Sequence, residues 1–429
     1  MVSINDRQPR IVGYCAPANT LRASRTVTCS HVDRREPVAV GRGQKDRIMA
    51  IQLFVPTFDV EACLDEIREC LEKGWTGAGF KTIEFEEAWK DYTGLPHAHF
   101  LNSATSGLHL ALDIYKELYG WEDGDEVLTT PITFVSTNHA ILHANLKPVF
   151  VDVDEFLCLD PDDVERKITP RTRAIVFVGL GGNTGQLARI HDICHRNELI
   201  FVLDAAHMAG TKRDGKTPSG DVTVHSFQAV KNLPTADAGM ICFADGGLDA
   251  VARRKSWLGI NKDTYARAAD ASAYKWQYEV QSVGYKYHGN SIMAAIALAQ
   301  LPHLDAHNAR RRAIGVLYDK GFAGHPHIAT VPTAPGCCSS RHLYQIMVQD
   351  REKLIADLNA RGINTGVHYR NNLEYPMFAD QHAACPKAAE LSQRVLSLPL
   401  HPQLSDNDVA RVIEAVCACV EERKSLANA

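Results

Sequence analysis

The chain has 429 residues, of which 45% are hydrophobic and 23% are charged. This balance excludes a disordered or fibrous protein. The length predicts two or three domains, or one large domain with an appendage, and a core that needs no disulfide. The formal net charge of −5 argues against a dedicated nucleic-acid binder. No stretch approaches the ~18 uninterrupted apolar residues of a membrane-spanning helix, so we expect no membrane segment.

The first 48 residues differ from the rest. They carry eight Arg and one Lys against four acids, and they contain no apolar core of a secretory signal. We expect residues 1–48 to be a disordered extension or to follow a start codon placed too far upstream; a transit peptide is the alternative. The twelve cysteines are scattered without a CxxC pair, which predicts free thiols, no metal site and a cytoplasmic protein.

Helix and strand patterns alternate from about residue 58 to 300. Ala174–Val178 and Leu199–Leu203 are short, fully apolar runs separated by a helical pattern, as in strands of a parallel sheet that is covered on both faces. Asp160-Pro161 predicts a helix start. Asp59 also predicts one, for a helix that ends near Gly74 and whose apolar stripe is Val60, Leu64, Ile67 and Leu71.

The pattern changes after residue 310. Short strand-like pieces and helices follow, which predicts a smaller α+β domain. We therefore expect a large domain over residues 49–310 and a small C-terminal domain over residues 311–429. Arg310–Arg312 lies on a predicted helix, and we interpret it as a solvated helix face.

Two glycine-containing segments match phosphate-binding patterns. Gly210–Thr217 fits GxxxxGK[ST], but Pro218 and a strand-like run follow it where a phosphate-binding loop needs a helix, so we interpret it as a hairpin turn. Gly179–Gly185 follows a strand and precedes a helical pattern and Asp204, as in a dinucleotide-binding fingerprint. Its position in the middle of the chain disfavours that interpretation, which nevertheless remains an alternative.

One set of residues fits a pyridoxal phosphate (PLP) site. Asp204 ends an apolar strand, where ligands of α/β sheets bind, and Lys231 follows a later strand among small and apolar residues. A buried lysine has a lowered pKa and can form a Schiff base, while the carboxylate can hold the pyridine nitrogen protonated. The phosphate needs a helix N-terminus and hydroxyls, and the ring needs a stacking partner. Ala104, Thr105, Ser226 and Phe134 supply these groups.

The sequence resembles the DegT/DnrJ/EryC1/StrS family of PLP-dependent sugar aminotransferases over roughly residues 52–425. It is most similar to members that aminate nucleotide-linked 4-keto sugars. The resemblance implies the aspartate-aminotransferase-like α/β fold. The stretches that carry it are Gly77–Glu84, Asn102–Leu112, Pro131–Thr137, Asp204–Gly210, Ser226–Leu233, Gly284–Ala295, His342–Tyr344 and His368–Tyr369.

The resemblance implies a role for each matching residue. Lys231 is the Schiff-base lysine and proton carrier, Asp204 is the partner of the pyridine nitrogen, and His207 lies beside the ring. Ala104, Thr105 and Ser226 bind the phosphate, and Phe134 stacks on the ring. The segment Gly284–Asn290 completes the phosphate site of a partner subunit, through Lys286, His288 or Asn290, of which we favour His288. Tyr344, His368 and Tyr369 are the expected substrate-side residues.

The expected protein is thus a homodimeric aminotransferase. It would convert a nucleotide-linked keto sugar, a 4-keto-6-deoxyhexose, into the amino sugar with glutamate as donor, and pyridoxamine phosphate would be the intermediate form of the cofactor. A PLP-dependent dehydratase and a non-catalytic, regulatory member of the fold are alternatives. The family usually reads GEGG where this chain has Ala236-Asp237-Ala238-Gly239. The presence of Lys231, which family dehydratases replace with His, favours transamination.

Overall fold

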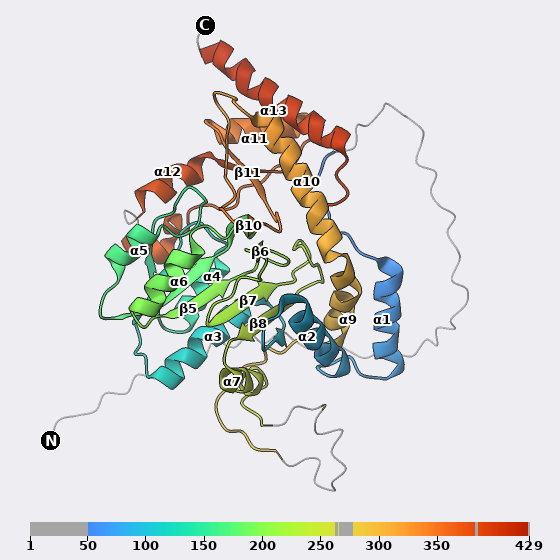
Figure 1. Ribbon diagram of the computed structural model, residues 1–429, viewed down its shortest axis with the longest axis vertical. Coiled ribbons are helices and arrows are strands. Elements are labelled where there is room, and N and C mark those ends of the chain that lie inside the picture. Colours follow the sequence, from blue (N-terminus) through green and yellow to red (C-terminus); the bar gives the residue numbers. More distant parts are fainter. Residues whose placement is uncertain (1–49, 262–264, 266–277, 382–384, 428–429) are drawn as a thin grey trace, which may run out of the picture. The chain divides into compact units, whose positions relative to one another are not determined.

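The computed structural model describes residues 50–261, 265, 278–381 and 385–427 (Figure 1). The expected extension, residues 1–48, lies outside these ranges. Ile48–Ala429 forms one compact unit, and the elements below belong to it.

A seven-stranded sheet forms the centre of the fold, as the apolar runs predict. Its strand order is β1-β8-β7-β5-β4-β2-β3. The pairs from β7 to β3 are parallel, and β8 runs antiparallel to both of its neighbours. The strands are β1 (His99–Leu101), β2 (Glu126–Thr129), β3 (Lys147–Phe150), β4 (Thr172–Val178), β5 (Ile200–Asp204), β7 (Val222–Ser226) and β8 (Gly239–Phe243).

Apolar side chains cover both faces of this sheet. Val176 and Val202 pack in a cluster with residues of helix α3, whereas Phe177 and Phe201 pack with residues of helix α6 on the other face. Because successive strand residues point to opposite faces, the strands are apolar throughout. The helices of this part are α2 (Phe80–Thr93), α3 (Ala104–Tyr119), α4 (Ser136–His143), α5 (Pro161–Lys167), α6 (Leu187–Arg196), α7 (Gly246–Ser256) and α9 (Ser291–Gln300).

A second sheet of three strands has its own apolar cluster, which includes residues of helices α10, α11 and α13. The expected domain boundary at residues 310–311 lies inside α10, which continues unbroken through it. Ile51 forms a parallel bridge with Ile363 beside this sheet. The elements are α10 (Leu304–Phe322), β9 (Ala329–Thr330), β11 (Tyr344–Met347), α11 (Arg351–Ala360), α12 (Pro386–Arg394), β12 (Val395–Leu398) and α13 (Asp406–Ala427).

The first described helix, α1 (Val60–Glu72), begins where Asp59 predicts, but its orientation corrects the prediction. The Asp59 side chain accepts a hydrogen bond from the Ala62 N–H group. The buried positions of α1 are Cys63 and Cys70, whereas Leu64 and Leu71 of the expected apolar stripe are exposed. The helix packs on α9, whose Ala-rich sequence admits a close neighbour, so the small cysteines face inward.

Neither glycine-containing segment forms a nucleotide site. Lys212–Arg213 (β6) turns back on itself through Gly215 and pairs with Cys337–Cys338 (β10), as the hairpin interpretation predicts. In Gly179–Gly185, a Cβ at Gly179 would lie 2.0 Å from the Met208 sulfur, and one at Gly182 would lie 2.2 Å from the Ser340 hydroxyl oxygen. These glycines therefore pack against protein, and the dinucleotide interpretation is wrong.

None of the helices described is long and apolar enough to cross a membrane. No group of His, Cys, Asp and Glu in the described part of the chain could hold a metal ion. None of the ten cysteines in these ranges forms a disulfide.

Candidate active site

A cavity of about 480 Å³ lies at the carboxyl ends of the central strands. Val178 and Asp204, which end β4 and β5, both line it. This is the edge at which parallel α/β sheets bind ligands, and the volume is in the usual range for small-molecule sites. Its other lining residues are Ser103, Ala104, Thr105, Thr133, Phe134, Ser136, Thr137, Ala206, His207, Ser226, Gln228, Val230, Lys231, Asp237, Ala238, His368 and Tyr369.

Asp204 is a buried carboxylate with two hydrogen-bond donors. The Thr137 hydroxyl donates to Oδ2 at 2.8 Å, and the Ala206 N–H donates to Oδ1 at 3.1 Å. Burial raises the pKa of Asp204, while these two bonds and the charge of Lys231 oppose that rise. A buried carboxylate can accept more than two hydrogen bonds, so Asp204 suits a further, cationic N–H partner.

Lys231 lies in the same cavity. Its side chain is half-buried. The loss of contact with water lowers the pKa of Lys231 to about 8, although the charge of Asp204 works in the opposite direction. A lysine with a pKa of about 8 is unprotonated in roughly one molecule in ten at pH 7, far more often than an ordinary lysine, which makes it a nucleophile and a proton carrier.

The N-terminus of α3 forms another wall. The Ser103 hydroxyl accepts from the Ser106 N–H at 3.1 Å, which leaves the N–H groups of Ala104 and Thr105 for an acceptor in the cavity. A Cβ on Gly239 would lie 2.5 Å from the Ala104 nitrogen, so glycine lets β8 approach this turn. The positive end of the helix dipole and the Ser226 hydroxyl favour an anion here.

His207 and Tyr369 form a hydrogen-bonded pair on the cavity wall. The Gly181 N–H donates to His207 Nδ1 at 3.2 Å, and His207 Nε2 lies 3.1 Å from the Tyr369 hydroxyl. Burial, with the charge of Lys231, holds the pKa of His207 far below its usual value. In the neutral ring Nδ1 accepts, so Nε2 carries the proton and donates to Tyr369. The Tyr369 hydroxyl proton therefore remains available to an acceptor in the cavity.

His342 packs behind His207, with ring centroids 4.3 Å apart. The Asn232 amide nitrogen donates to Asn308 Oδ1 and to the Ser340 carbonyl, both at 2.8 Å. Its Oδ1 must therefore accept from His342 Nδ1, which lies at 3.0 Å. Burial and the neighbouring His207 lower the pKa of His342. This chain of hydrogen bonds fixes the tautomer of His342 and the position of the ring against which His207 packs.

These groups fit PLP. Asp204 has the acceptor capacity for a pyridinium nitrogen, Lys231 has the lowered pKa of a Schiff-base lysine, and the N-terminus of α3 has two N–H groups for a phosphate. Phe134, which is 58% exposed and lines the same cavity, would pack against the ring. The donor set thus provides a partner for each part of the cofactor.

The structure brings together most of the residues that the sequence singles out. The nine of them that line the cavity are Ala104, Thr105, Phe134, Asp204, His207, Ser226, Lys231, His368 and Tyr369.

Tyr344 and His288 are not among the lining residues. Tyr344 is in β11, 1% exposed, and its hydroxyl donates to Asp319 Oδ1 at 2.7 Å, so it belongs to the core of the three-stranded sheet. His288 lines a different cavity of about 90 Å³, and its ring lies edge-on to Trp257 with centroids 4.2 Å apart.

Sequence reasoning missed Thr137 and His342. Thr137 stands three residues after Phe134, and a single turn at the start of α4 carries it to Asp204. His342 stands two residues before Tyr344, outside β11, next to Arg341 with its φ of 48°. In the sequence, the only indication that Thr137 and His342 belong to the site was their position inside the stretches that carry the family resemblance.

The chain is similar to known proteins over most of its length. The chain is 36% identical over 367 residues to the spore coat polysaccharide biosynthesis protein SpsC of Bacillus subtilis, which covers 82% of this chain and 93% of SpsC. The sugar aminotransferase CalS13 from Micromonospora echinospora superposes with a TM-score of 0.79 at 30% identity, over 86% of this chain and 99% of CalS13.

Spr1654 from Streptococcus pneumoniae was solved in a PLP form and in a PMP form. The PLP form superposes with a TM-score of 0.79 at 28% identity, over 87% of this chain and 99% of that one. Residues 58–417 match the DegT/DnrJ/EryC1/StrS aminotransferase family. With a cavity whose groups fit PLP, the chain belongs to this family and is a PLP-dependent aminotransferase.

Proposed function

We propose that this aminotransferase moves an amino group from glutamate to the keto carbon of a nucleotide-linked 4-keto-6-deoxyhexose. The observation that carries the proposal is that Lys231 and Asp204 line one cavity and each alters the pKa of the other. The sugar assignment is supported by the resemblance to CalS13, a sugar aminotransferase, and to SpsC, a polysaccharide biosynthesis protein.

Lys231, Asp204 and Thr137 have different roles in the proposed reaction. When bound, PLP supplies an electron sink that stabilises negative charge on the carbon that gains or loses a proton. Lys231 carries that proton, and its lowered pKa permits both protonation states near neutral pH. Asp204 holds the proton on the ring nitrogen. Thr137 keeps the carboxylate ionised and oriented, because its hydrogen bond opposes the rise in the pKa of Asp204.

Further polar groups that line the cavity would bind the substrate. His368 and Tyr369 line the cavity beside Gln228 and Asp237. The Tyr369 hydroxyl, which accepts from His207, can donate to a sugar oxygen. Burial and the charge of Lys231 lower the pKa of His368 to about 4, so it is neutral at pH 7 and can donate or accept.

The proposal is tested with purified protein, PLP, glutamate and a panel of nucleotide-linked 3-keto and 4-keto sugars. Mass spectrometry should show an amino sugar and one equivalent of 2-oxoglutarate. Lys231→Ala should abolish both products, while Lys216→Ala, in the exposed hairpin, should retain them. A deoxygenated keto sugar without a new amine would indicate the dehydratase instead. No conversion by the wild type of glutamate and any sugar on the panel would contradict the proposal.

We further propose a homodimer in which His288 reaches the phosphate of the partner's cofactor. In its own chain His288 lies outside the 480 Å³ cavity, and the nearby Val283 is 88% exposed. Mixing inactive Lys231→Ala chains with impaired His288→Ala chains should restore activity, because one of the two sites in a mixed dimer would then be intact. If His288 served its own chain, mixing would restore nothing.

A further inference from the structure

Arg311 is a buried cation without a protein partner among the described residues. It lies on α10 between Arg310, which pairs with Asp406 at 2.7 Å, and Arg312, which donates to the Ser339 carbonyl at 3.4 Å. Arg311 is only 7% exposed, and its Nη1 is buried without a hydrogen bond. This corrects the sequence interpretation of Arg310–Arg312 as a solvated helix face.

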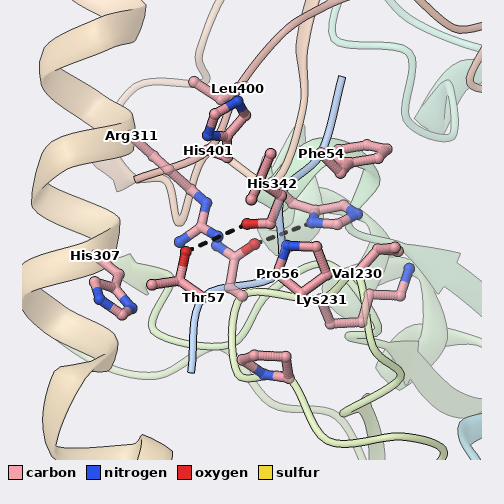
Figure 2. Close-up of a pocket in the computed structure, with 13 residues that line it drawn as sticks. Phe54, Pro56, Thr57, Val230, Lys231, His307, Arg311, His342, Leu400 and His401 are labelled. Carbon is pink, nitrogen blue, oxygen red and sulfur yellow. Dashed lines mark hydrogen bonds between the residues drawn. The ribbon is translucent and has the colours of Figure 1, made fainter. Parts of the chain in front are cut away.

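The guanidinium of Arg311 points into a small cavity. Figure 2 shows the side chain leaving α10 and ending among Thr57, Pro56 and His342. The cavity volume is about 10 Å³, counted as space for the centre of a small particle, which is room for one water molecule or one monatomic ion. None of its lining residues is an acid; they are Phe54, Val55, Pro56, Thr57, Val230, Lys231, Asn232, Pro234, His307, Arg311, His342, Leu400 and His401.

The charge of Arg311 is therefore uncompensated where the structure describes its surroundings. Burial lowers the pKa of Arg311 to about 10, so the guanidinium is still protonated at pH 7. Its charge helps to lower the pKa of His307, His342 and His401, which together surround it. An isolated buried cation is costly, and the protein offers neutral imidazoles in place of a counter-charge.

We propose that this cavity binds one small monovalent inorganic anion, of the size of chloride, against the Arg311 guanidinium. The volume excludes a carboxylate that carries a carbon chain, and the lining supplies both the positive charge and polar N–H or O–H groups. Val230 and Lys231 line this cavity as well as the 480 Å³ cavity, so the anion would lie directly behind the segment that carries the catalytic lysine.

Bromide tests the site directly, because it scatters anomalously and resembles chloride. Crystals of the wild-type holoenzyme soaked in bromide should show an anomalous peak within contact distance of the Arg311 guanidinium. A water molecule without anomalous signal at this position would overturn the proposal, and so would a carboxylate of added glutamate bound to Arg311. A bromide peak that persists unchanged in Arg311→Met would also overturn it.

Thermal unfolding of the holoenzyme gives an independent readout. At constant ionic strength, replacing gluconate with chloride should raise the Tm of the wild type, because an anion that binds only the folded state stabilises it. Arg312→Met is the matched control and should respond like the wild type, because Arg312 is the next residue on α10 and its guanidinium already donates to the Ser339 carbonyl. Arg311→Met should lose the chloride response. An equal response in Arg311→Met and wild type, or no response in either, would contradict the proposal.

Discussion

The Thr137 hydroxyl donates to the Asp204 carboxylate at 2.8 Å, and both residues are buried in a wall of the cavity. Thr137 also lies 2.9 Å from the Thr133 hydroxyl. Since the Thr137 proton goes to Asp204, Thr133 must donate to Thr137. The Thr133 hydroxyl therefore supports the Thr137 hydroxyl, which in turn stabilises the negative charge that we propose for holding the ring nitrogen of the cofactor protonated.

Thr137→Val should weaken PLP binding. The substitution keeps the shape but removes the hydrogen bond, so the pKa of Asp204 should rise further and its negative charge should become less available to the cofactor. A hydrogen bond to a charged group contributes about 1.5 kcal/mol or more, which corresponds to a loss of roughly tenfold in affinity. Titration of the cofactor-free protein with PLP measures this. Thr137→Ser should bind nearly as well as wild type; equal binding by the valine variant would contradict this role.

Lys231→Met should stabilise the cofactor-free protein at neutral pH. The folded protein lowers the pKa of Lys231 to about 8, below its unfolded value of about 10.4, so the unfolded state binds more protons between these values. Lys231 therefore lowers the free energy of unfolding by its full amount below pH 8, and this loss disappears as the pH rises to about 10.4. Urea unfolding should show a gain on the order of 1–3 kcal/mol at pH 7 and little gain at pH 10.5. A gain that grows with pH would refute the assignment.

Ser103→Asp should separate helix capping from anion binding. Aspartate caps helices as well as serine, so the cofactor-free protein should keep its stability to within about 0.5 kcal/mol. The new negative charge, however, lies beside the N–H groups of Ala104 and Thr105 and should repel the phosphate. We expect PLP affinity to fall by at least tenfold, whereas affinity for pyridoxal without its phosphate should change little. An equal loss for both compounds would mean that the wall itself is distorted.

Gly239→Ala should damage the same wall by steric contact. Its Cβ would lie 2.5 Å from the Ala104 nitrogen and from the Ser103 carbonyl carbon, which are backbone atoms that cannot rotate away. We expect a loss of about 1–3 kcal/mol in unfolding free energy and weaker PLP binding. Gly77→Ala is the control, because a Cβ there would have no neighbour within 4 Å. Equal stability of the two variants would contradict the close packing of β8 on α3.

The local features of the fold were predictable where one residue type decides them. Asp160 caps α5 by accepting from the Asp162 N–H, and Pro161 occupies the first turn, as the dipeptide predicts. The apolar runs around Val176 and Val202 became parallel strands. The buried side of α1 was not predictable, because it depends on which surface its neighbour α9 offers, and the apolar pattern of α1 contains no information about that.

The site was also predictable only in part, because some of its residues depend on contacts between segments that are far apart in the sequence. Lys231 and Asp204 stand at strand ends, and chemistry at strand ends can be inferred from pattern alone. His342 and Thr137 act through contacts with His207 and Asp204 that exist only after folding. Tyr344 matches the family stretch equally well, yet the backbone turn at Arg341 places His342 against the site and Tyr344 in the core.

The segment from Ile51 to Thr57 has a practical consequence for making shorter versions of the protein. The Ile51 N–H donates to the Gly362 carbonyl, its carbonyl accepts from Asn364, and the Leu53 carbonyl accepts from Leu400. Phe54 packs its ring parallel to that of His342 at 5.5 Å. A shortened chain that begins at Ala50 keeps all of these interactions, whereas a chain that begins at Phe58 loses all of them. Expression trials should therefore start the chain no later than Ala50.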